Sequence, residues 1–254
     1  MFSLNPEPHC MQTPSVTASY TVSERRFYTG MAIAIFVAVF VGFSRSFFLR
    51  PLFPEHPSPS EPIFYIHGAL FTLWILLFAF QVTLISRGSI QMHRNIGLVG
   101  MLLAIAMVVL GIMGALYAAA RPTGFVGIPV PGLSFMAIPF FDMILFSTFV
   151  TMAYLERRIA QSHKRWMVLA TLNLITAAIA RWPVINTLGP LAYFAITDLF
   201  VVALAIWDFR SRKKLHRVTL VGGLLLFISH PIRLVVSGTA AWLSFAAWAT
   251  GFVK

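Results

Sequence analysis

The 254-residue chain is 58% hydrophobic and only 11% charged, with a mean hydropathy of +0.82. One soluble core of this size needs far less apolar surface, so the composition predicts a membrane protein with the lipid bilayer as its main partner. The net charge of +11 comes from cations placed between apolar runs, which argues against nucleic-acid binding. The lone cysteine, Cys10, excludes an intrachain disulfide.

Seven apolar stretches have the roughly 17 to 25 residues that cross a hydrocarbon core about 30 Å thick. They are Phe27–Phe43, Ile63–Ile85, Ile96–Ala118, Phe135–Leu155, Trp166–Trp182, Leu191–Trp207 and Val218–Val236. The sequence therefore predicts an all-α fold, a seven-transmembrane-helix bundle in a single domain over residues 27–236. We expect residues 1–26 to form a polar cytoplasmic tail and residues 237–254 an interfacial C-terminal segment with a short helix.

Lys and Arg in the loops predict the orientation, because cytoplasmic loops carry their excess. One set of loops holds thirteen cations: Arg25, Arg26, Arg87, Arg94, Arg157, Arg158, Lys164, Arg165, Arg210, Arg212, Lys213, Lys214 and Arg217. The other set holds only Arg45, Arg50 and Arg121. We therefore expect an N-in, C-out topology. The Gly- and Pro-rich outer segment Arg121–Ser134 either caps the bundle or lies on its surface.

Six ionisable residues lie toward the outer ends of five predicted helices: His67, Asp142, Arg181, Asp198, His230 and Arg233. An ionised residue at mid-helix costs about 2.5 to 3.5 kcal/mol on insertion scales, so we expect the two Asp to pair with Arg181 and Arg233. His67 and His230 then remain to bind a ligand or carry protons. The alternative is a set of interhelical ion pairs with a purely structural role.

A second set of histidines, His93, His163 and His216, begins the third, fifth and seventh predicted helices, and a cation follows each one. In one hypothesis His67 and His230 bind an outer haem b, and His93 with His163 or His216 binds an inner one. The alternative is a surface that binds lipid headgroups or phosphate.

Small residues follow His93 along one face of its helix, at alternating spacings of three and four: Gly97, Gly100, Ala104, Gly111 and Gly114, with Met107 among them. Such a face is typical of helix packing in membranes, and it would also admit a planar ligand.

Several motifs resemble those of a group of bacterial multipass inner-membrane proteins. They are His67-Gly68-Ala69-Leu70-Phe71-Thr72-Leu73-Trp74, His93-Arg94, His163-Lys164-Arg165-Trp166-Met167, Ala180-Arg181-Trp182-Pro183 and Ser229-His230-Pro231-Ile232-Arg233. The resemblance implies the bacterial inner membrane and carries no activity with it. Similarity to cytochrome b561-type proteins is architectural only. Seven-helix zinc hydrolases of the alkaline ceramidase type share His and Asp residues, but their paired histidines on the last helix are absent here.

Three hypotheses follow. The first is a redox protein that holds haem or a metal at His67 and His230 and exchanges electrons with a quinone. In this hypothesis Arg181 and Arg233 neutralise the haem propionates. The second is a metal-dependent hydrolase of a lipid or small amphiphile, with a divalent metal held by His67, Asp142, Asp198 and His230. The third is a non-enzymatic proton-coupled transporter or assembly factor. Whether the protein is an enzyme stays open at this point.

Overall fold

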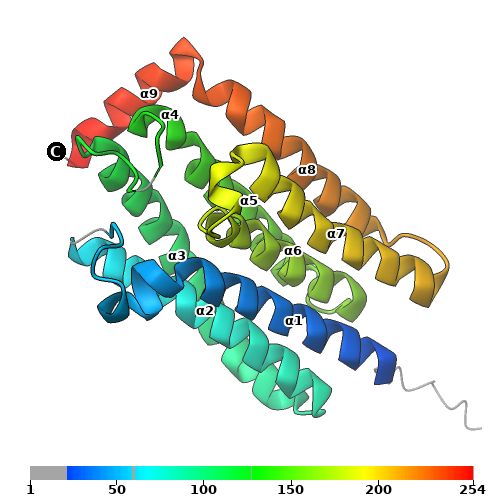
Figure 1. Ribbon diagram of the computed structural model, residues 1–254. Helices are drawn as coiled ribbons and strands as arrows, with labels where there is room; N and C mark the ends of the chain where they lie inside the picture. Colours follow the sequence, from blue (N-terminus) through cyan, green and yellow to red (C-terminus); the bar gives the residue numbers. More distant parts are fainter. Residues whose placement is uncertain (1–21, 59–60, 127, 254) are drawn as a thin grey trace, which may run out of the picture.

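The computed structural model describes residues 22–58, 61–126 and 128–253, and every regular element in these ranges is helical (Figure 1). Cys10 and most of the predicted tail lie outside the described residues. Seven long helices occupy the predicted apolar stretches in order: α1 (Val22–Phe43), α2 (Pro62–Ser86), α3 (Ile90–Ala120), α5 (Ala137–Leu155), α6 (Ala160–Ile179), α7 (Pro190–Arg212) and α8 (Arg217–Ser237). Short helical segments are Ser44–Phe48, Arg50–Leu52, α4 (Gly132–Phe135), Ile185–Thr187, α9 (Ala240–Thr250) and Gly251–Val253.

Six of the long helices in the described ranges have the length and hydropathy to cross a membrane, so the chain is a multipass membrane protein. The long helix outside this set is α6, which carries Arg165, Asn173 and Thr176 in buried positions. Neighbouring helices shield these side chains from lipid, so α6 does not need an apolar surface all round. The expected count of seven spans stays a prediction.

Helix α6 forms the centre of the bundle. It packs against α1, α5, α7 and α8, while α2 packs between α1 and α3 at one side (Figure 1). Gly42 allows the closest approach of α1 to α6, since a Cβ atom there would overlap the backbone of Ala178. The indole Nε1 of Trp74 donates to Thr171 Oγ1 at 3.3 Å and joins α2 to α6. The bundle therefore has α1 to α3 on one side of α6, and α7 and α8 on the other.

The ends of the bundle differ in charge. At the end where α1, α3, α6 and α8 begin, which we name the basic end, interhelical polar contacts involve several of the thirteen cations. Arg25 donates to the Ser86 carbonyl at 3.0 Å, and Arg217 pairs with Glu156 at 2.5 Å. The thirteen cations therefore share one end, as the loop count predicts. Lys164 and Arg165, expected in a loop, lie instead in the first turns of α6.

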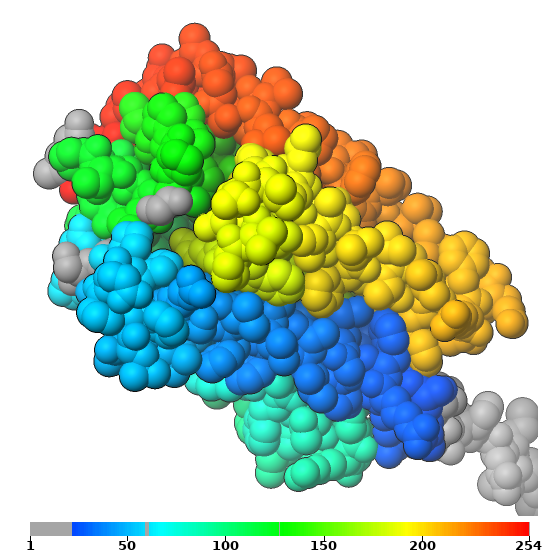
Figure 2. Space-filling model, viewed as in Figure 1, coloured from blue at the N-terminus to red at the C-terminus, as the bar shows by residue number. Residues whose placement is uncertain are grey.

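The opposite end, which we name the distal end, is covered by connecting segments. Figure 2 shows the segments near residues 50, 125 and 245 adjoining there. Arg121 pairs with Glu61 at 3.2 Å, and the Trp242 indole donates to the Leu133 carbonyl at 2.9 Å. The described part of the Arg121–Ser134 segment thus folds under α9 and caps the bundle, which is the first of its two expected placements. A C-terminal helix forms as predicted, and its location at the interface stays a prediction.

Candidate functional site

A buried ion pair joins α5 to α8 near the distal end. Asp142 Oδ1 accepts from Arg233 Nη1 at 2.5 Å, and both side chains are almost fully inaccessible. The guanidinium also donates to the hydroxyl of Ser229, one turn earlier on α8, at 2.8 Å. The predicted pairing of Arg233 with a buried Asp is confirmed. The guanidinium and the carboxylate neutralise each other in a place where water cannot hydrate them.

A carboxylate–histidine pair lies beside it. His230 Nδ1 is 3.3 Å from Asp198 Oδ2, so α8 is joined to α7 as well. The imidazole stacks on Phe194 with ring centroids 4.2 Å apart, and the Arg233 guanidinium lies 5.5 Å from the same ring. Phe194 therefore contacts both pairs and fixes their relative position. The partner of Asp198 is His230, not the expected arginine.

Three polar atoms of this region are buried without a hydrogen-bond partner among the described residues: His230 Nε2, Asp198 Oδ1 and Asn173 Oδ1. The Asn173 amide donates to the Asp142 backbone carbonyl at 2.7 Å, so α6 contributes to the same region. An unpaired buried polar atom costs about 1 to 3 kcal/mol, and such atoms concentrate at functional sites. We name Asp142, Asn173, Asp198, Ser229, His230 and Arg233 the distal polar cluster.

His67 and Arg181 are not in contact with this cluster. The His67 ring stacks on Phe71 at 4.1 Å, and its Nδ1 faces Gly114 on α3, 3.5 Å from where a Cβ atom would stand. Arg181 donates to the Ala177 carbonyl at 2.6 Å and lies over the Phe43 ring at 4.8 Å. The expected convergence of six residues is therefore reduced to four: Asp142, Asp198, His230 and Arg233.

The haem hypothesis places His67 and His230 on one cofactor. Yet α2 packs on α1 and α3, whereas α8 packs on α5, α6 and α7. The two histidines are therefore on helices that do not pack against each other.

The small-residue face of α3 is occupied by side chains, with Leu77 against Gly100 and Met143 against Gly111. At these two glycines the face packs against α2 and α5, which corresponds to the first of its two expected roles.

The metal hypothesis requires His67, Asp142, Asp198 and His230 around one ion. Within the described ranges, no three His, Cys, Asp or Glu side chains are grouped closely enough to hold a metal ion. His230 and Asp198 form a pair, Asp142 is engaged by Arg233, and His67 lies between α2 and α3. The geometry of these side chains therefore does not form the four-ligand site.

The inner histidines separate into a pair and a single residue. His93 and His163 approach each other with ring centroids 6.1 Å apart and nearly perpendicular planes. His163 Nδ1 contacts the Ala153 carbonyl at 2.8 Å. His216 instead caps α8, accepting from the Val218 backbone N–H at 3.1 Å through Nδ1. Of the two expected inner pairings, the fold brings together His93 and His163.

A second buried ion pair was missed at the basic end. Asp208 on α7 accepts two hydrogen bonds from Arg165 on α6, one at 3.0 Å from Nε and one from Nη2. Thr219 Oγ1 donates to it at 2.6 Å and the His216 backbone N–H at 3.2 Å. Arg165 was counted among the loop cations just before the fifth predicted span, and Asp208 directly follows the sixth, so neither residue was expected in the interior of the bundle. The detectable signal was an Asp directly after an apolar run in a chain with only eight acidic residues.

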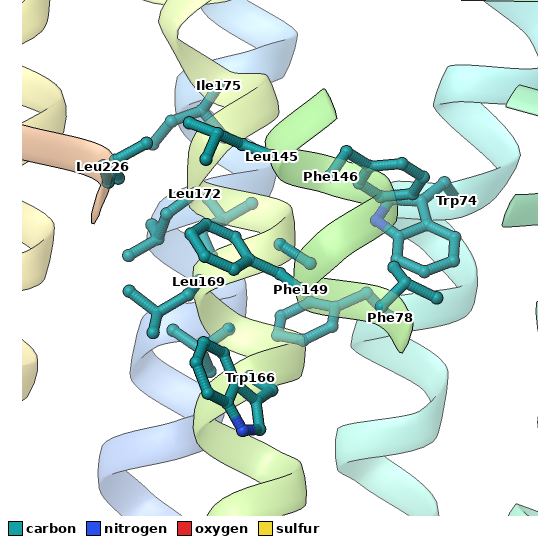
Figure 3. Close-up of a cluster of buried hydrophobic side chains, with 14 of the residues drawn as sticks. Trp74, Phe78, Leu145, Phe146, Phe149, Trp166, Leu169, Leu172, Ile175 and Leu226 are labelled. Atoms are coloured by element: carbon teal, nitrogen blue, oxygen red, sulfur yellow. The ribbon is translucent and has the colours of Figure 1, made fainter. Parts of the chain in front are cut away.

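An apolar layer separates the distal polar cluster from the Arg165–Asp208 pair. Arg165 and Asn173 are eight residues apart on α6, about 12 Å along the axis. Between them Leu169 and Leu172 are fully buried, and Leu204 on α7 and Leu226 on α8 are equally inaccessible. Figure 3 shows Leu169, Leu172 and Leu226 gathered around α6. The layer divides the polar interior of the bundle into two halves.

Comparisons with protein families, with curated proteins and with solved structures find no match to this chain.

Proposed function

We propose that this protein is a proton-coupled membrane transporter whose distal polar cluster binds the coupling proton. The observation that carries the proposal is the His230–Asp198 pair, with the imidazole Nε2 free and buried beside the Asp142–Arg233 ion pair. Ionisable residues inside membrane bundles mark ion pathways and proton relays. Histidine suits this role because its unperturbed pKa lies near physiological pH.

The apolar layer supports the same proposal. A transporter must not leak protons between its two faces, and a dry layer of leucine side chains blocks a continuous chain of water. Leu172, Leu204 and Leu226 supply such a barrier between the distal polar cluster and the Arg165–Asp208 pair. In the proposed cycle the helices around α6 move so that the distal polar cluster exchanges protons with one face at a time.

The hydrolase and redox hypotheses have less support. Hydrolysis through zinc requires about three protein ligands, and no group of three is formed by the described side chains. A haem held by His67 and His230 would have to join α2 to α8 past the helices that separate them. The proton-transport proposal requires neither arrangement.

The proposal includes a location and an orientation. We place the protein in a bacterial inner membrane with seven spans, α6 among them, and with the basic end in the cytoplasm. The excess of cations at that end supports this orientation. Cysteine labelling in intact cells tests it: in a Cys10→Ser background, Ser211→Cys should resist a membrane-impermeant maleimide and Ser58→Cys should react. The reverse pattern contradicts the orientation.

Proton flux tests the function directly. The purified protein is reconstituted in vesicles containing a pH-sensitive dye, and a potassium gradient with valinomycin sets the membrane potential. Pools of amino acids, sugars and small organic ions are then added in turn as co-substrates. We expect at least one pool to drive proton flux well above that without a co-substrate and above that of empty vesicles, and at least a tenfold decrease of this flux in His230→Gln and Asp198→Asn. His56→Gln, the same exchange in the connecting segment before α2, is the matched control. Wild-type flux equal to that of empty vesicles with every pool, or unchanged co-substrate-driven flux in His230→Gln, contradicts the proposal.

An absorbance spectrum and metal analysis of the same sample separate this proposal from its alternatives. A stoichiometric Soret band lost in His230→Ala would favour the redox hypothesis, and stoichiometric zinc would favour the hydrolase. Proton flux in a sample with neither signal supports transport without a cofactor.

A further inference from the structure

An apolar groove runs along the surface between α1 and α2. It consists of two adjoining hollows of about 130 and 250 Å³, with Phe36 in the wall of both. Ala32 and Phe40 line it from α1, and Ile75 and Ala79 from α2. The hydroxyl of Thr72, also in the wall, donates to the Gly68 carbonyl of its own helix at 2.7 Å. The groove therefore offers an apolar surface to its occupant.

The length of the groove suits one leaflet of a bilayer. From Thr29 to Phe40 the helix advances about 16 Å at 1.5 Å per residue. Half of a hydrocarbon core about 30 Å thick is nearly the same distance. A single acyl chain that begins at the basic end would therefore extend along the groove to the middle of the membrane.

Positive charge is concentrated where the groove meets the basic end. Arg25 Nη1 donates to the Ser86 carbonyl at 3.0 Å and links α1 to α2 one turn beyond Thr29. Arg26 and Arg87, both exposed, adjoin this link in the sequence. The neighbouring acid, Glu24, accepts from Gln161 Nε2 at 3.1 Å on the α6 side. Arg25 thus lies beyond the basic end of the groove, and the helix spacing puts Arg26 and Arg87 within one turn of its lining residues Thr29 and Thr83.

We propose that this groove binds an anionic glycerophospholipid, with one acyl chain between α1 and α2 and the phosphate at Arg25, Arg26 and Arg87. Arginine suits this role because its planar guanidinium donates two parallel hydrogen bonds to phosphate oxygens. The phosphate of a lipid lies just outside the hydrocarbon core, at the level of these helix ends. The proposal depends on the α1–α2 surface and not on proton transport by the distal polar cluster.

Native mass spectrometry tests the groove. The protein is equilibrated in detergent with equal amounts of dioleoyl phosphatidylglycerol and dioleoyl phosphatidylcholine. We expect one retained phosphatidylglycerol, with at least a fivefold preference over phosphatidylcholine. Ala79→Phe fills the groove and should decrease retention of that lipid at least fivefold. Ala195→Phe, the same exchange at an exposed position on α7, should have no effect.

The headgroup contacts are tested separately. The double variant Arg26→Gln and Arg87→Gln should lose the preference for phosphatidylglycerol, whereas Arg45→Gln with Arg50→Gln at the other end should keep it. Neither arginine of the first variant is buried, so this variant remains informative if Ala79→Phe fails to fold. Equal retention of the two lipids by the wild type, or a preference that survives the Arg26 and Arg87 exchange, overturns the proposal.

Discussion

Asp142 and Arg233 are 91 residues apart in the chain, yet their side chains meet 2.5 Å apart in the interior of the bundle. This ion pair joins α5 to α8, and the Ser229 hydroxyl and the Phe194 ring hold the guanidinium in place. The neighbouring His230–Asp198 pair joins α8 to α7 through the same region. The two pairs thus link three helices, α5, α7 and α8, and fix the rotation of each helix about its axis relative to the others.

Arg233→Ala should destabilise the protein by about 3 to 5 kcal/mol, because it leaves the Asp142 carboxylate buried without a partner. The combined variant Arg233→Met and Asp142→Leu should recover most of that loss, since it buries no unpaired charge. Thermal unfolding in detergent measures both effects. A double variant as unstable as Arg233→Ala would show that the pair contributes more than charge neutralisation.

Asp208→Asn should decrease the free energy of unfolding by about 3 to 5 kcal/mol, because it removes the negative charge that neutralises the buried Arg165 guanidinium. It also weakens the hydrogen bonds that Asp208 accepts from Thr219 and from the His216 backbone. Asp198→Asn should decrease the free energy of unfolding by only about 1 kcal/mol, since Asp198 has one hydrogen-bond partner among the described residues, His230. Comparing the free energies of unfolding of the two variants checks the difference. Equal losses would contradict the larger contribution that the four hydrogen bonds of Asp208 predict.

Gly42→Ala should destabilise the bundle by about 1 to 3 kcal/mol, because the new methyl group overlaps the Ala178 backbone and forces α1 away from α6. Gly30→Ala, on the same helix, meets no heavy atom within 4 Å and should change the stability by less than about 1 kcal/mol in either direction. Thermal unfolding midpoints of the two variants provide the measurement. Similar midpoints would mean that α1 and α6 do not approach at Gly42.

The stability should decrease in mild acid through His216. Burial, followed by repulsion from Arg165, lowers the pKa of His216 from 6.5 to about 4. Between these values the unfolded chain binds a proton that the folded chain does not. The stability that the neutral His216 ring contributes is therefore complete above pH 6.5 and is lost as the pH falls toward 4. The protonated ring also can no longer accept the Val218 N–H at Nδ1.

His216→Asn keeps an acceptor at the start of α8 but does not titrate. Its unfolding midpoint should therefore decrease less than that of the wild type when the pH is lowered from about 7 to about 4.5. Measuring the two midpoints across this window separates His216 from other groups, which titrate in both proteins. Parallel curves would exclude His216 as the source of the acid sensitivity.

Local sequence was enough to predict the helical class and the positions of the long helices. A bilayer permits few solutions for an apolar run, because every backbone amide must find its partner within the helix. Ile63–Ile85 therefore predicted α2 closely, and Phe27–Phe43 predicted the end of α1. The predicted starts of α1 and α6 were too late by five and six residues, because Arg25, Arg26, Lys164 and Arg165 resembled loops.

The partners of the buried charges were decided only by the tertiary structure. Sequence reasoning placed Asp142, Asp198, His230 and Arg233 at similar depths, and depth follows from counting residues along a helix. It could not place His67 outside that group, because the rotation of each helix about its axis depends on contacts such as Gly114 with His67. Depth is a property of one helix, whereas the choice of partner depends on how several helices pack together.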